Sequence, residues 1–409
     1  MTWRARIRKE RPLQSGRLTP FQSLMRHWSA LTPFNFAHAM RLTKPLDLGR
    51  WQQAASAAIG GMGAGVAPIS IATGDVDIDT HLTAELNRGF DEVDLPFRFF
   101  AIDAHDGGHW LAVTIDHWWA DDFSCRALLQ QIYSAYESGR HLNDDTLRLP
   151  TRCSRPRSWL GEAIAFMKEA ARYRRACRRP LRDPLDFRTQ TFRTAFPEEA
   201  LPKIRQFARQ NDATVHDALL AAAAQAFGVR HGPPRKGRDA VALISAMDLR
   251  RFENGAARTA FGVALSQYAV VVRQPHKSSA QEVLQQVAAQ TRPLKARQGT
   301  DVFRPALLAW RLSRSARSKA TWFQRAAPAS AGLSNVNLTG SWMERPEISE
   351  YRRVAAPGAA VPMALMITTF KGRLFIDTTF RMTAFKRSEA ESLVSDIKQS
   401  LLNPASAGG

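Results

Sequence analysis

An alternating apolar segment followed directly by a helical pattern is the feature that most constrains this chain. Apolar side chains occupy every second position of residues 109–115 and share one face, which predicts a strand. Residues 123–136 carry apolar side chains about once per helical turn, which predicts an amphipathic helix. Residues 116–122 therefore form a strand-to-helix junction, where a rigid scaffold can present a side chain to a cleft.

A histidine and an aspartate, His117 and Asp121, lie four residues apart at this junction. A neutral imidazole can act as a general base, taking a proton from a hydroxyl or an amine and returning it to a leaving group. The carboxylate of Asp121 can orient that imidazole or pair with a distant arginine. Equally, His117 can be a packed histidine beside two tryptophans, with Asp121 or Asp122 as the N-cap of the following helix. The spacing alone leaves these interpretations open, because it recurs by chance.

The junction resembles the HHxxxDG signature of the condensation-domain and chloramphenicol-acetyltransferase-like acyltransferases, a superfamily that includes bacterial wax ester synthases. The resemblance implies that His117 is the catalytic histidine and that Asp121 is the aspartate of the signature. Asp116 stands where the signature has its first histidine, and Asp122 stands where it has glycine. A side chain in place of that glycine can narrow the substrate channel or change its charge.

Further segments resemble the same superfamily in the same order along the chain. Residues 18–25 look like the segment before the first strand, and residues 46–55 look like the first helix. Residues 213–222 look like the TVND-type helix, with His216 in place of asparagine. Residues 243–250 look like the strand that ends in an arginine, and residues 333–337 look like the SNV segment.

The resemblance assigns roles to residues in these segments. Arg250 is the expected partner of Asp121, and such a pair would connect the two halves of the chain. A partly buried ion pair of this kind indicates how the site is arranged more than it indicates a gain in stability. Trp118, Ser334 and Asn335 are expected at the substrate channel, where Ser334 and Asn335 can help to hold the acyl carbonyl or its oxyanion. Three of these segments also have a purely structural interpretation: residues 213–222 as a core helix, Arg250 as a surface residue, and Ser334 with Asn335 as a turn.

The length of 409 residues exceeds what one hydrophobic core normally supports, which predicts two domains. Two prolines in residues 178–185 interrupt a helical pattern and indicate the boundary. We therefore expect an N-terminal lobe, residues 1–185, that carries the HxxxD turn, and a C-terminal lobe, residues 186–409, that completes the channel. The expected fold class is α/β (α+β), with two similar chloramphenicol-acetyltransferase-like lobes, mixed sheets and, as the resemblance implies, an active-site channel between the lobes.

The C-terminal half alternates between the two periodicities. Its pattern predicts strands at residues 190–196, 241–247, 265–272, 363–369 and 374–380 and helices at residues 215–227 and 280–290. Residues 371–373 contain a glycine between the last two strands and predict a hairpin turn.

Several classes of protein are disfavoured. No apolar run reaches the roughly 18 residues of a membrane span, and residues 1–11 lack the apolar core of a signal peptide, so we expect a cytoplasmic protein. The glycines of residues 60–65 lack the lysine and hydroxyl residue of a phosphate loop, so we expect a flexible loop there. Cys125, Cys153 and Cys177 are widely separated, which predicts free thiols and no metal site.

The formal net charge of +20 requires an anionic partner or a solvated basic surface. An apolar stripe at helical spacing in residues 159–173 adjoins the densest basic cluster, which consists of Arg172, Arg174, Arg175, Arg178, Arg179 and Arg182. A basic amphipathic helix suits an anionic membrane surface, and the same field would attract an acidic acyl carrier protein or the phosphates of coenzyme A. The sequence disfavours nucleic acid as a partner, because no nucleic-acid-binding signature accompanies the arginines.

These observations favour a cytoplasmic acyltransferase. If the basic helix around residues 159–173 binds lipid, the protein would be peripheral at the membrane. An acyl thioester of coenzyme A or of carrier-bound phosphopantetheine would present its carbonyl near His117, and no bound cofactor or metal is required. Two alternatives remain. One is a degenerate condensation-like domain that binds a carrier protein or lipid without chemistry, and the other is a basic protein that binds a membrane surface or nucleic acid.

Overall fold

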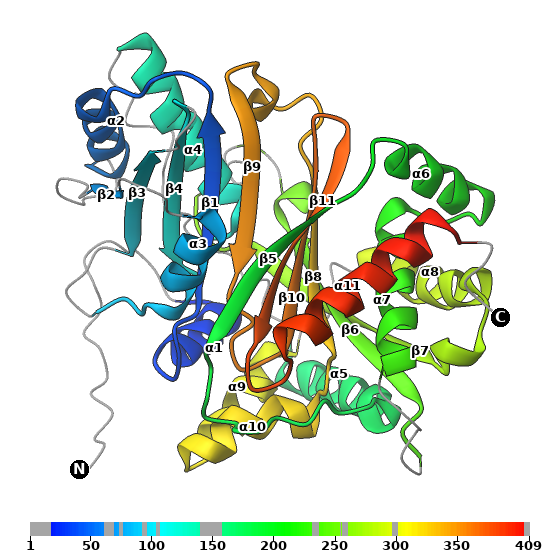
Figure 1. Cartoon of the computed structure of the whole chain (residues 1–409). Helices are drawn as coiled ribbons and strands as arrows, with labels where there is room; N and C mark the ends of the chain where they lie inside the picture. The colour runs from blue at the N-terminus through cyan, green and yellow to red at the C-terminus, as the bar shows by residue number, and fades with distance from the viewer. Residues whose placement is uncertain are drawn as a thin grey trace.

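The computed structural model describes most of the chain in two lobes. The described residues are 18–60, 69–72, 77–91, 96–103, 107–139, 158–230, 237–253, 255, 261–296 and 302–404. Each lobe contains one mixed β-sheet with helices packed against it (Figure 1), so the predicted α/β class with two lobes is confirmed. Residues 1–11, most of the glycine-rich segment 60–65, and Cys153 lie outside the described residues.

The first sheet has the strand order β2-β3-β4-β1-β9. Its strands are β1 (Asn35–Leu42), β2 (Ile69–Ala72), β3 (Phe97–Asp103), β4 (His109–Asp116) and β9 (Ile348–Ala355). The second sheet has the order β5-β11-β10-β8-β6-β7. Its strands are β5 (Thr189–Ala195), β6 (Ala240–Asp248), β7 (Leu265–Arg273), β8 (Ala331–Asn337), β10 (Met363–Phe370) and β11 (Arg373–Arg381).

The described helices cover the outer faces and one end of the sheets. They are α1 (Pro20–Ser29), α2 (Leu48–Gly60), α3 (Ile78–Asn87), α4 (Asp122–Ser138), α5 (Trp159–Arg172), α6 (Ala200–Gln210), α7 (Val215–Arg230), α8 (Ala280–Ala296), α9 (Phe303–Leu312), α10 (Ala316–Ala326) and α11 (Arg387–Leu402). Among the described helices, none is long and apolar enough to cross a membrane.

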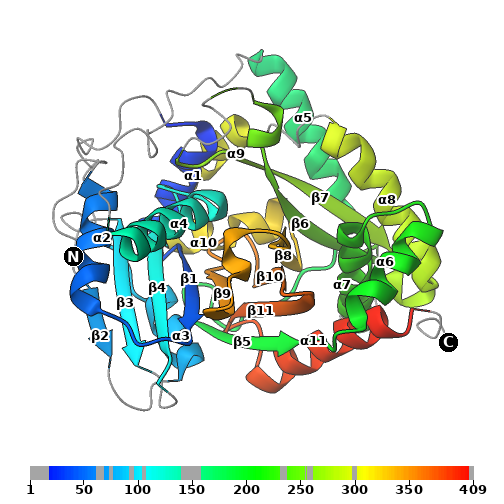
Figure 2. The ribbon, with the colours of Figure 1, turned by 90° about the horizontal axis from the view of Figure 1, so that it is seen from above.

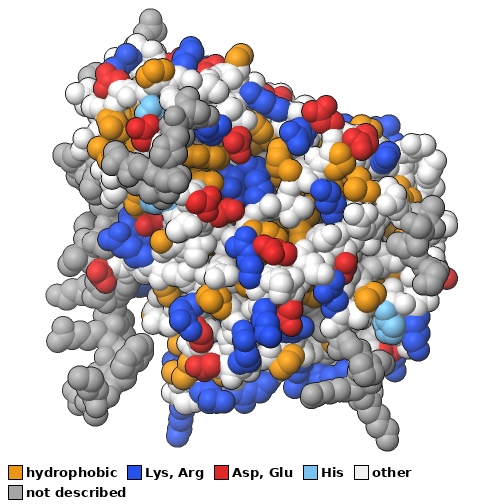
Figure 3. Space-filling view, in the orientation of Figure 1, with side chains coloured by type: hydrophobic (Ala, Val, Ile, Leu, Met, Phe, Trp, Pro, Cys, Tyr) orange, Lys and Arg blue, Asp and Glu red, His pale blue; other side chains and the backbone are white. Residues whose placement is uncertain are grey.

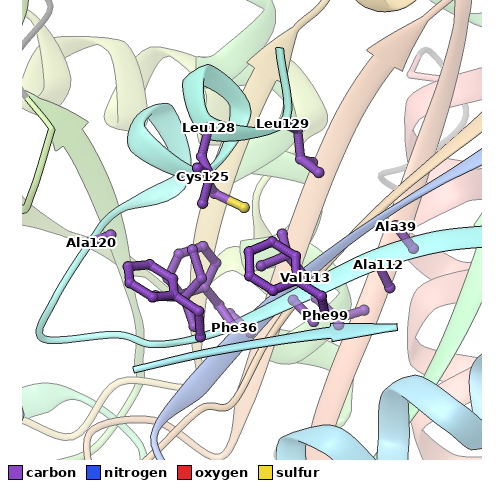
Figure 4. Close-up of a cluster of buried hydrophobic side chains, with 14 of the residues drawn as sticks. Phe36, Ala39, Phe99, Ala112, Val113, Ala120, Cys125, Leu128 and Leu129 are labelled. Carbon is purple, nitrogen blue, oxygen red and sulfur yellow. The ribbon is translucent and has the colours of Figure 1, made fainter. Parts of the chain in front are cut away.

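The strand and helix predicted around the junction are both present, as β4 and α4. The alternation in β4 directs one set of its apolar side chains toward α4, which lies across the first sheet. Figure 4 shows Cys125 and Leu128 of α4 facing Phe36, Phe99 and Val113 of the sheet. Cys125 is a free, buried thiol whose pKa is raised well above its ordinary value by burial. This dry packing fixes where the junction lies.

Helix α7 is the core helix of the second lobe. Residues 217–228 are buried, because α7 packs between the second sheet and helices α6, α8 and α11. Thr214 and Asp217 cap its N-terminus reciprocally: the Asp217 N–H donates to Thr214 Oγ1 at 3.2 Å, and the Thr214 N–H donates to the Asp217 carboxylate at 2.9 Å. The interpretation of this segment as a core helix is confirmed.

The hairpin predicted between the last two strands is also confirmed. Strands β10 and β11 pair antiparallel up to Phe370 and Arg373, so only Lys371 and Gly372 form the turn. Both turn residues have positive φ, 47° and 74°. This is the backbone that a two-residue hairpin with the natural strand twist requires, and glycine adopts it without a steric penalty.

One strand crosses between the lobes. β9 follows two thirds of the second lobe in sequence, yet it pairs antiparallel with β1 and completes the first sheet. Seen from above, β9 lies between the rest of the first sheet and strands β10 and β11 of the second (Figure 2). A division of the chain at residue 185 therefore does not separate the two sheets. The strand brings residues of the C-terminal half to the junction.

Candidate active site at the strand-to-helix junction

His117 lies in the tight turn, residues 117–121, that joins β4 to α4; we call it the His117 turn. The backbone N–H of His117 donates to the carbonyl of Phe34 at 3.0 Å, which anchors the turn to the start of β1. The imidazole lies against two aromatic rings, with centroids 5.1 Å from Phe34 and 4.8 Å from Phe36. These contacts hold the ring in one orientation.

The surroundings of His117 favour a neutral imidazole. Its Nδ1 lies 3.3 Å from the carbonyl oxygen of Ala120. Because a carbonyl can only accept, this contact favours the tautomer with the proton on Nδ1, which leaves Nε2 with a lone pair. Burial lowers the pKa of His117 below its ordinary value of 6.5. A neutral ring with a basic Nε2 is the state that a general base needs.

Asp121 is both the N-cap of α4 and the partner of an arginine. Its Oδ1 accepts from the N–H and the hydroxyl of Ser124, at 3.0 and 2.9 Å. Its Oδ2 accepts from Arg250 Nη1 at 2.7 Å and from the N–H of Ala264 at 2.8 Å. Four donors therefore satisfy this fully buried carboxylate. Of the three roles that the sequence left open for Asp121, helix N-cap and arginine partner occur together, whereas the donors to its carboxylate are Ser124, Arg250 and Ala264 and do not include the His117 imidazole.

Arg250 connects the His117 turn to the second lobe. It lies in a single 3₁₀ turn, Arg250–Phe252, directly after β6. Besides Asp121, its guanidinium binds the hydroxyl of Ser124 and the carbonyl of Gly262, both at 3.0 Å. The pair expected from the sequence is thus present, and it is buried on both sides. Every charged group in it has hydrogen-bond partners, which is the condition for such a pair to be tolerated away from water.

Asp122, at the position of the signature glycine, faces a second arginine. Its Oδ1 lies 2.5 Å from Nε of Arg353 on β9 and 3.2 Å from Nε2 of His38 on β1, and its Oδ2 lies 3.1 Å from Arg126. Burial alone would raise the pKa of Asp122, but Arg126, Arg353 and His38 hold it well below its ordinary value. The carboxylate stays charged, and its charge is compensated by two guanidinium groups.

Arg353 links Asp122 to the opposite wall of the site. It is fully buried, and its Nη2 donates to the hydroxyl of Ser334 on β8 at 2.9 Å. Its neighbour His38 accepts or donates a 2.6 Å hydrogen bond at Nδ1 with the hydroxyl of Tyr351. Burial lowers the pKa of His38 and raises that of Tyr351, so both stay neutral. Asp122 therefore belongs to a polar network that spans β1, β8 and β9.

The sequence interpretation missed His38, Arg126, Tyr351 and Arg353. The one signal it contained was a pair of arginines, Arg352 and Arg353, directly before the apolar residues Val354, Ala355 and Ala356. Long charged side chains are almost never fully buried unless they are paired. A buried strand with two arginines therefore predicts buried carboxylates as their partners.

Two residues expected at the channel point elsewhere. The indole of Trp118 donates to Asp116 at 2.8 Å and packs on Trp119, and Trp118 does not line the pocket beside His117. Asn335 also lies outside the lining, because alternation along β8 places it on the opposite face from Ser334, beside Ile367 of β10. Both corrections follow from contacts that only the folded chain makes.

Asp116, at the position of the first signature histidine, is a buried structural residue. It accepts from the hydroxyl of Ser29 at 2.6 Å and from the indole of Trp118 at 2.8 Å. It therefore joins α1 to the His117 turn and does not line the pocket.

A pocket of about 170 Å³ lies between the two lobes at His117. From the first lobe, Phe34, Phe36 and His117 line it, and from the second, Ile244, Leu265 and Ser334. We call it the reaction pocket. Its ionisable lining residues are His117 and Asp122, while most of the wall is apolar. Among the described residues, no cluster of three His, Cys, Asp or Glu side chains could hold a metal ion.

Solved structures share this architecture. The condensation domain of the monacolin K polyketide synthase MokA matches with a TM-score of 0.66 at 14% identity, over 93% of this chain and 97% of that chain. The chain has the condensation-domain fold. The first condensation domain of the CDA synthetase matches with a TM-score of 0.66 at 13% identity, over 96% of this chain and 97% of that chain. The X-domain from teicoplanin biosynthesis matches with a TM-score of 0.62 at 17% identity, over 96% and 95%.

No protein-family model matches the chain, and no curated protein matches it in sequence. The similarity to condensation domains is therefore found by comparing three-dimensional structures. It confirms, for the fold, the resemblance that the short HxxxD segment suggested.

Proposed function

We propose that this protein is an acyltransferase that moves an acyl group from a thioester to a hydroxyl or amine acceptor, with His117 as the general base. The observation that carries the proposal is a neutral, aromatic-packed imidazole at the wall of an apolar pocket between the lobes. The Nδ1 contact with Ala120 leaves Nε2 as the proton acceptor.

The reaction follows from that geometry. Nε2 takes the proton of the acceptor as its oxygen or nitrogen attacks the acyl carbonyl. The tetrahedral intermediate collapses with cleavage of the carbon–sulfur bond, and the imidazolium returns the proton to the departing thiolate. The products are an ester or amide and a free thiol, so His117 ends the cycle neutral.

Ser334 is the proposed donor to the oxyanion. Its hydroxyl oxygen accepts from Arg353 at 2.9 Å, which leaves the O–H to donate into the reaction pocket that Ser334 lines. A donor polarised by a buried guanidinium and held by β8 is preorganised for a developing negative charge, and one such donor contributes about 3 kcal/mol to transition-state binding in a serine protease.

The thioester of coenzyme A or of carrier-bound phosphopantetheine is the proposed donor. Both present an acyl group on a slender thiol arm, which suits a pocket enclosed between two lobes, and both carry phosphates that a chain with a formal charge of +20 attracts. Contacts between the protein surface and the rest of the donor decide between coenzyme A and a carrier protein, and transfer rates with acyl thioesters of both kinds distinguish them.

A binding function without chemistry is the second candidate, and Asp122 is the observation that favours it. Its side chain lines the reaction pocket at the position where the signature has glycine. A solved structure of similar fold, the X-domain from teicoplanin biosynthesis, forms a complex with OxyB. In that candidate, the chain would hold a partner protein, and the network around Asp122 would serve only to join the lobes.

The test compares His117→Ala with the parent protein on a panel of acyl thioesters and acceptors, with products identified by mass spectrometry. We expect transfer to fall by about a thousandfold, the middle of the range of roughly 10²- to 10⁴-fold for loss of a general base. His276→Ala is the matched control, because His276 is exposed on the second lobe. Transfer by His117→Ala at the parental rate excludes this base, and the absence of transfer by the parent on every pair favours the binding function.

A further inference from the structure

A second cavity borders the reaction pocket and has no role in the mechanism above. It measures about 50 Å³ and lies beneath helices α5, α9 and α10. Ile244, Gln267 and Ala360 line both cavities. Because these three side chains belong to both linings, the second cavity adjoins the reaction pocket, and His117 lines only the latter; we call the second cavity the distal chamber.

The lining of the distal chamber is mostly apolar. Its aromatic and small residues from the three helices are Phe166, Ala170, Phe303, Ala306, Trp322, Phe323 and Ala326, and Tyr173 follows α5 directly. Among the described lining residues, the charged one is Glu169, whose carboxylate accepts from Arg172 at 2.8 Å. Arg172 is held in turn by the carbonyl of Ala269. The described part of the lining thus presents only a paired charge to the contents of the chamber.

We propose that the distal chamber holds the tail of an aliphatic acyl group whose carbonyl lies at His117. This proposal rests on the proposed function and narrows its substrate class to medium or longer aliphatic chains. The tail would pass between Ile244, Gln267 and Ala360. Since a chamber of about 50 Å³ has room for about three to five water-sized groups, at about 10–15 Å³ each, only a few terminal carbons fit. Each methylene buried there strengthens binding about fourfold.

The experiment fills or enlarges the chamber and varies the chain. Ala306→Phe blocks it from α9, Phe166→Ala enlarges it from α5, and Ala171→Phe on the exposed face of α5 is the matched control. Transfer rates are measured with butanoyl and dodecanoyl thioesters. Affinities are measured calorimetrically with the corresponding non-hydrolysable acyl thioethers, and melting temperatures verify the fold.

We expect Ala306→Phe to weaken dodecanoyl transfer and binding by at least about tenfold while butanoyl values stay within about twofold. Phe166→Ala should shift the preference to longer chains. Unchanged dodecanoyl binding in both variants overturns the chamber proposal, even if His117-dependent transfer persists. If no donor is turned over, the proposed function fails, and the calorimetric chain-length dependence still decides whether the chamber binds a tail.

The outer face of the same helices carries an independent feature. Sequence periodicity predicts one apolar stripe in residues 159–173, but the structure divides it: Phe166 faces the distal chamber, whereas Met167 faces outward. Leu160, Ile164 and Met167 follow one another at helical spacing and are 68%, 48% and 64% exposed. On α9, Leu308 and Leu312 are also exposed.

This apolar face is the main concentration of its kind. Nine large apolar side chains are exposed in the described part of the chain, and six lie on α5 and α9, which contact each other: Trp159, Leu160, Ile164, Met167, Leu308 and Leu312. Scattered exposed apolar residues are ordinary, but a contiguous group marks an interaction surface.

Basic residues border this face on α9 and α10, and the carboxylates of α5, Glu162 and Glu169, are buried, Glu162 beside Arg304 at 3.4 Å. No Asp or Glu occurs from residue 302 to residue 343, while α9, α10 and their connection carry Arg304, Arg311, Arg314, Arg317, Lys319 and Arg325. Figure 3 shows Lys and Arg side chains along the lower edge of the molecule, where α9 and α10 lie in Figure 1. The surface is therefore complementary to an anionic one.

The basic cluster that the sequence identified, at residues 172–182, is a different one, and most of its arginines are held by hydrogen bonds. Arg172, Arg178, Arg179 and Arg182 donate to backbone carbonyls of the second lobe or of α10. These arginines hold the connection after α5 in place, so the basic surface comes from α9 and α10 instead.

We infer that the outer face of α5 and α9 binds a bilayer that contains anionic phospholipids. The apolar side chains would enter the interface, and the arginines would remain at the headgroups, which is the arrangement of interfacial amphipathic helices. An acidic protein would match the charge, but the protruding Trp, Leu, Ile and Met side chains favour lipid. The distal chamber lies directly beneath this face, because inner residues of α5 and α9 line it.

Vesicle sedimentation of the full chain tests this inference, with vesicles of phosphatidylcholine alone or mixed with phosphatidylglycerol. One variant carries Leu160→Ser, Ile164→Ser and Met167→Ser, and a second carries Arg311→Glu, Arg314→Glu and Arg317→Glu. Val229→Ser is the matched control, because Val229 is equally exposed on the second lobe.

We expect the parent and the control to bind only the anionic vesicles, with affinity that falls as salt rises, and both multiple variants to bind at least about tenfold more weakly. Circular dichroism and melting temperature verify that the variants are folded. Failure of the parent to bind anionic vesicles overturns the inference, as does parental binding by both variants. Binding of an acidic carrier protein, in place of vesicles, through the same residues also overturns it.

Discussion

Asp121 and Asp122 are consecutive in the chain, yet they join the His117 turn to different parts of the molecule. Asp121 pairs with Arg250 after β6, is completely buried and has four hydrogen-bond donors. Asp122 pairs with Arg353 on β9, is 17% exposed and lines the reaction pocket. The first pair fixes the geometry of the turn in a dry environment, whereas the second places a compensated charge next to the proposed chemistry.

The difference indicates how the site tolerates two carboxylates beside a histidine base. A bare carboxylate close to His117 would raise the pKa of the imidazole and favour its charged form. Here both carboxylates are neutralised by guanidinium groups from the second half of the chain. His117 is therefore held by the fold and kept neutral by burial.

The largest effect is expected from breaking the Asp121 pair. Arg250→Leu leaves a buried carboxylate without its cation, so the free energy of unfolding should fall by about 3–5 kcal/mol. Chemical denaturation followed by circular dichroism measures it. Arg251→Ala, at an exposed neighbouring position, is the control and should change little. A loss below about 1 kcal/mol in Arg250→Leu would show that the pair does not fix the turn.

A smaller and pH-dependent effect is expected at Asp122. Its folded pKa lies well below the ordinary value of 3.8, so the charged carboxylate stabilises the fold above pH 3.8, and this contribution is lost as the pH falls toward the folded pKa. Asp122→Asn should lower the free energy of unfolding by about 2 kcal/mol at neutral pH, with the difference shrinking below about pH 4. Denaturation across a pH series measures the difference.

Asp396→Asn is the control for that series, since its pair with Arg230 is on the surface. A constant difference between Asp122→Asn and the parent from pH 7 to about pH 3 would contradict the assignment of the charge to Asp122.

Asp116 should contribute less than either. Asp116→Asn keeps one acceptor for Ser29 or Trp118 and weakens two charge-assisted hydrogen bonds, so we expect a loss of about 1 kcal/mol in the free energy of unfolding. Its side chain does not line the reaction pocket. Acyl-donor preference should therefore stay unchanged, and an altered preference would show that Asp116 reaches the substrate.

The smallest effect is a shift in the pH profile of kcat/KM. Because the proposed base must be neutral and burial lowers the pKa of His117, the acidic limb should lie below pH 6.5. Asp122 raises that pKa slightly, so Asp122→Asn should move the limb to still lower pH. Profiles of the two proteins with the same donor and acceptor provide the measurement. A limb above pH 7 in the parent would be inconsistent with a buried neutral base.

Local periodicity predicted most regular elements closely. The strand at residues 109–115 and the helix at residues 215–227 begin and end within a few residues of the observed ones. In these segments, the side-chain pattern and the final packing agree. The stripe at residues 159–173 was interpreted less well, because a helical pattern does not say which side of an apolar helix faces the core.

The site was predictable in part. The HxxxD spacing identified His117 and Asp121, and the arginine after β6 was expected to be the partner of Asp121. The roles of Trp118 and Asn335 were assigned from position in the chain, and neither lines the pocket. Arg353 and His38 were missed because β9 joins the first sheet from more than 200 residues away, which no local pattern encodes.

The sequence by itself determined the strand, turn and helix that present His117, since alternation, helical spacing and capping act over a few residues. Only the tertiary structure decided that Asp122 is compensated by Arg353 and that α5 has an outward apolar face. The physical reason is the range of the interactions. Backbone propensity is local, whereas the burial of a charge or of an apolar surface depends on which distant segment packs against it.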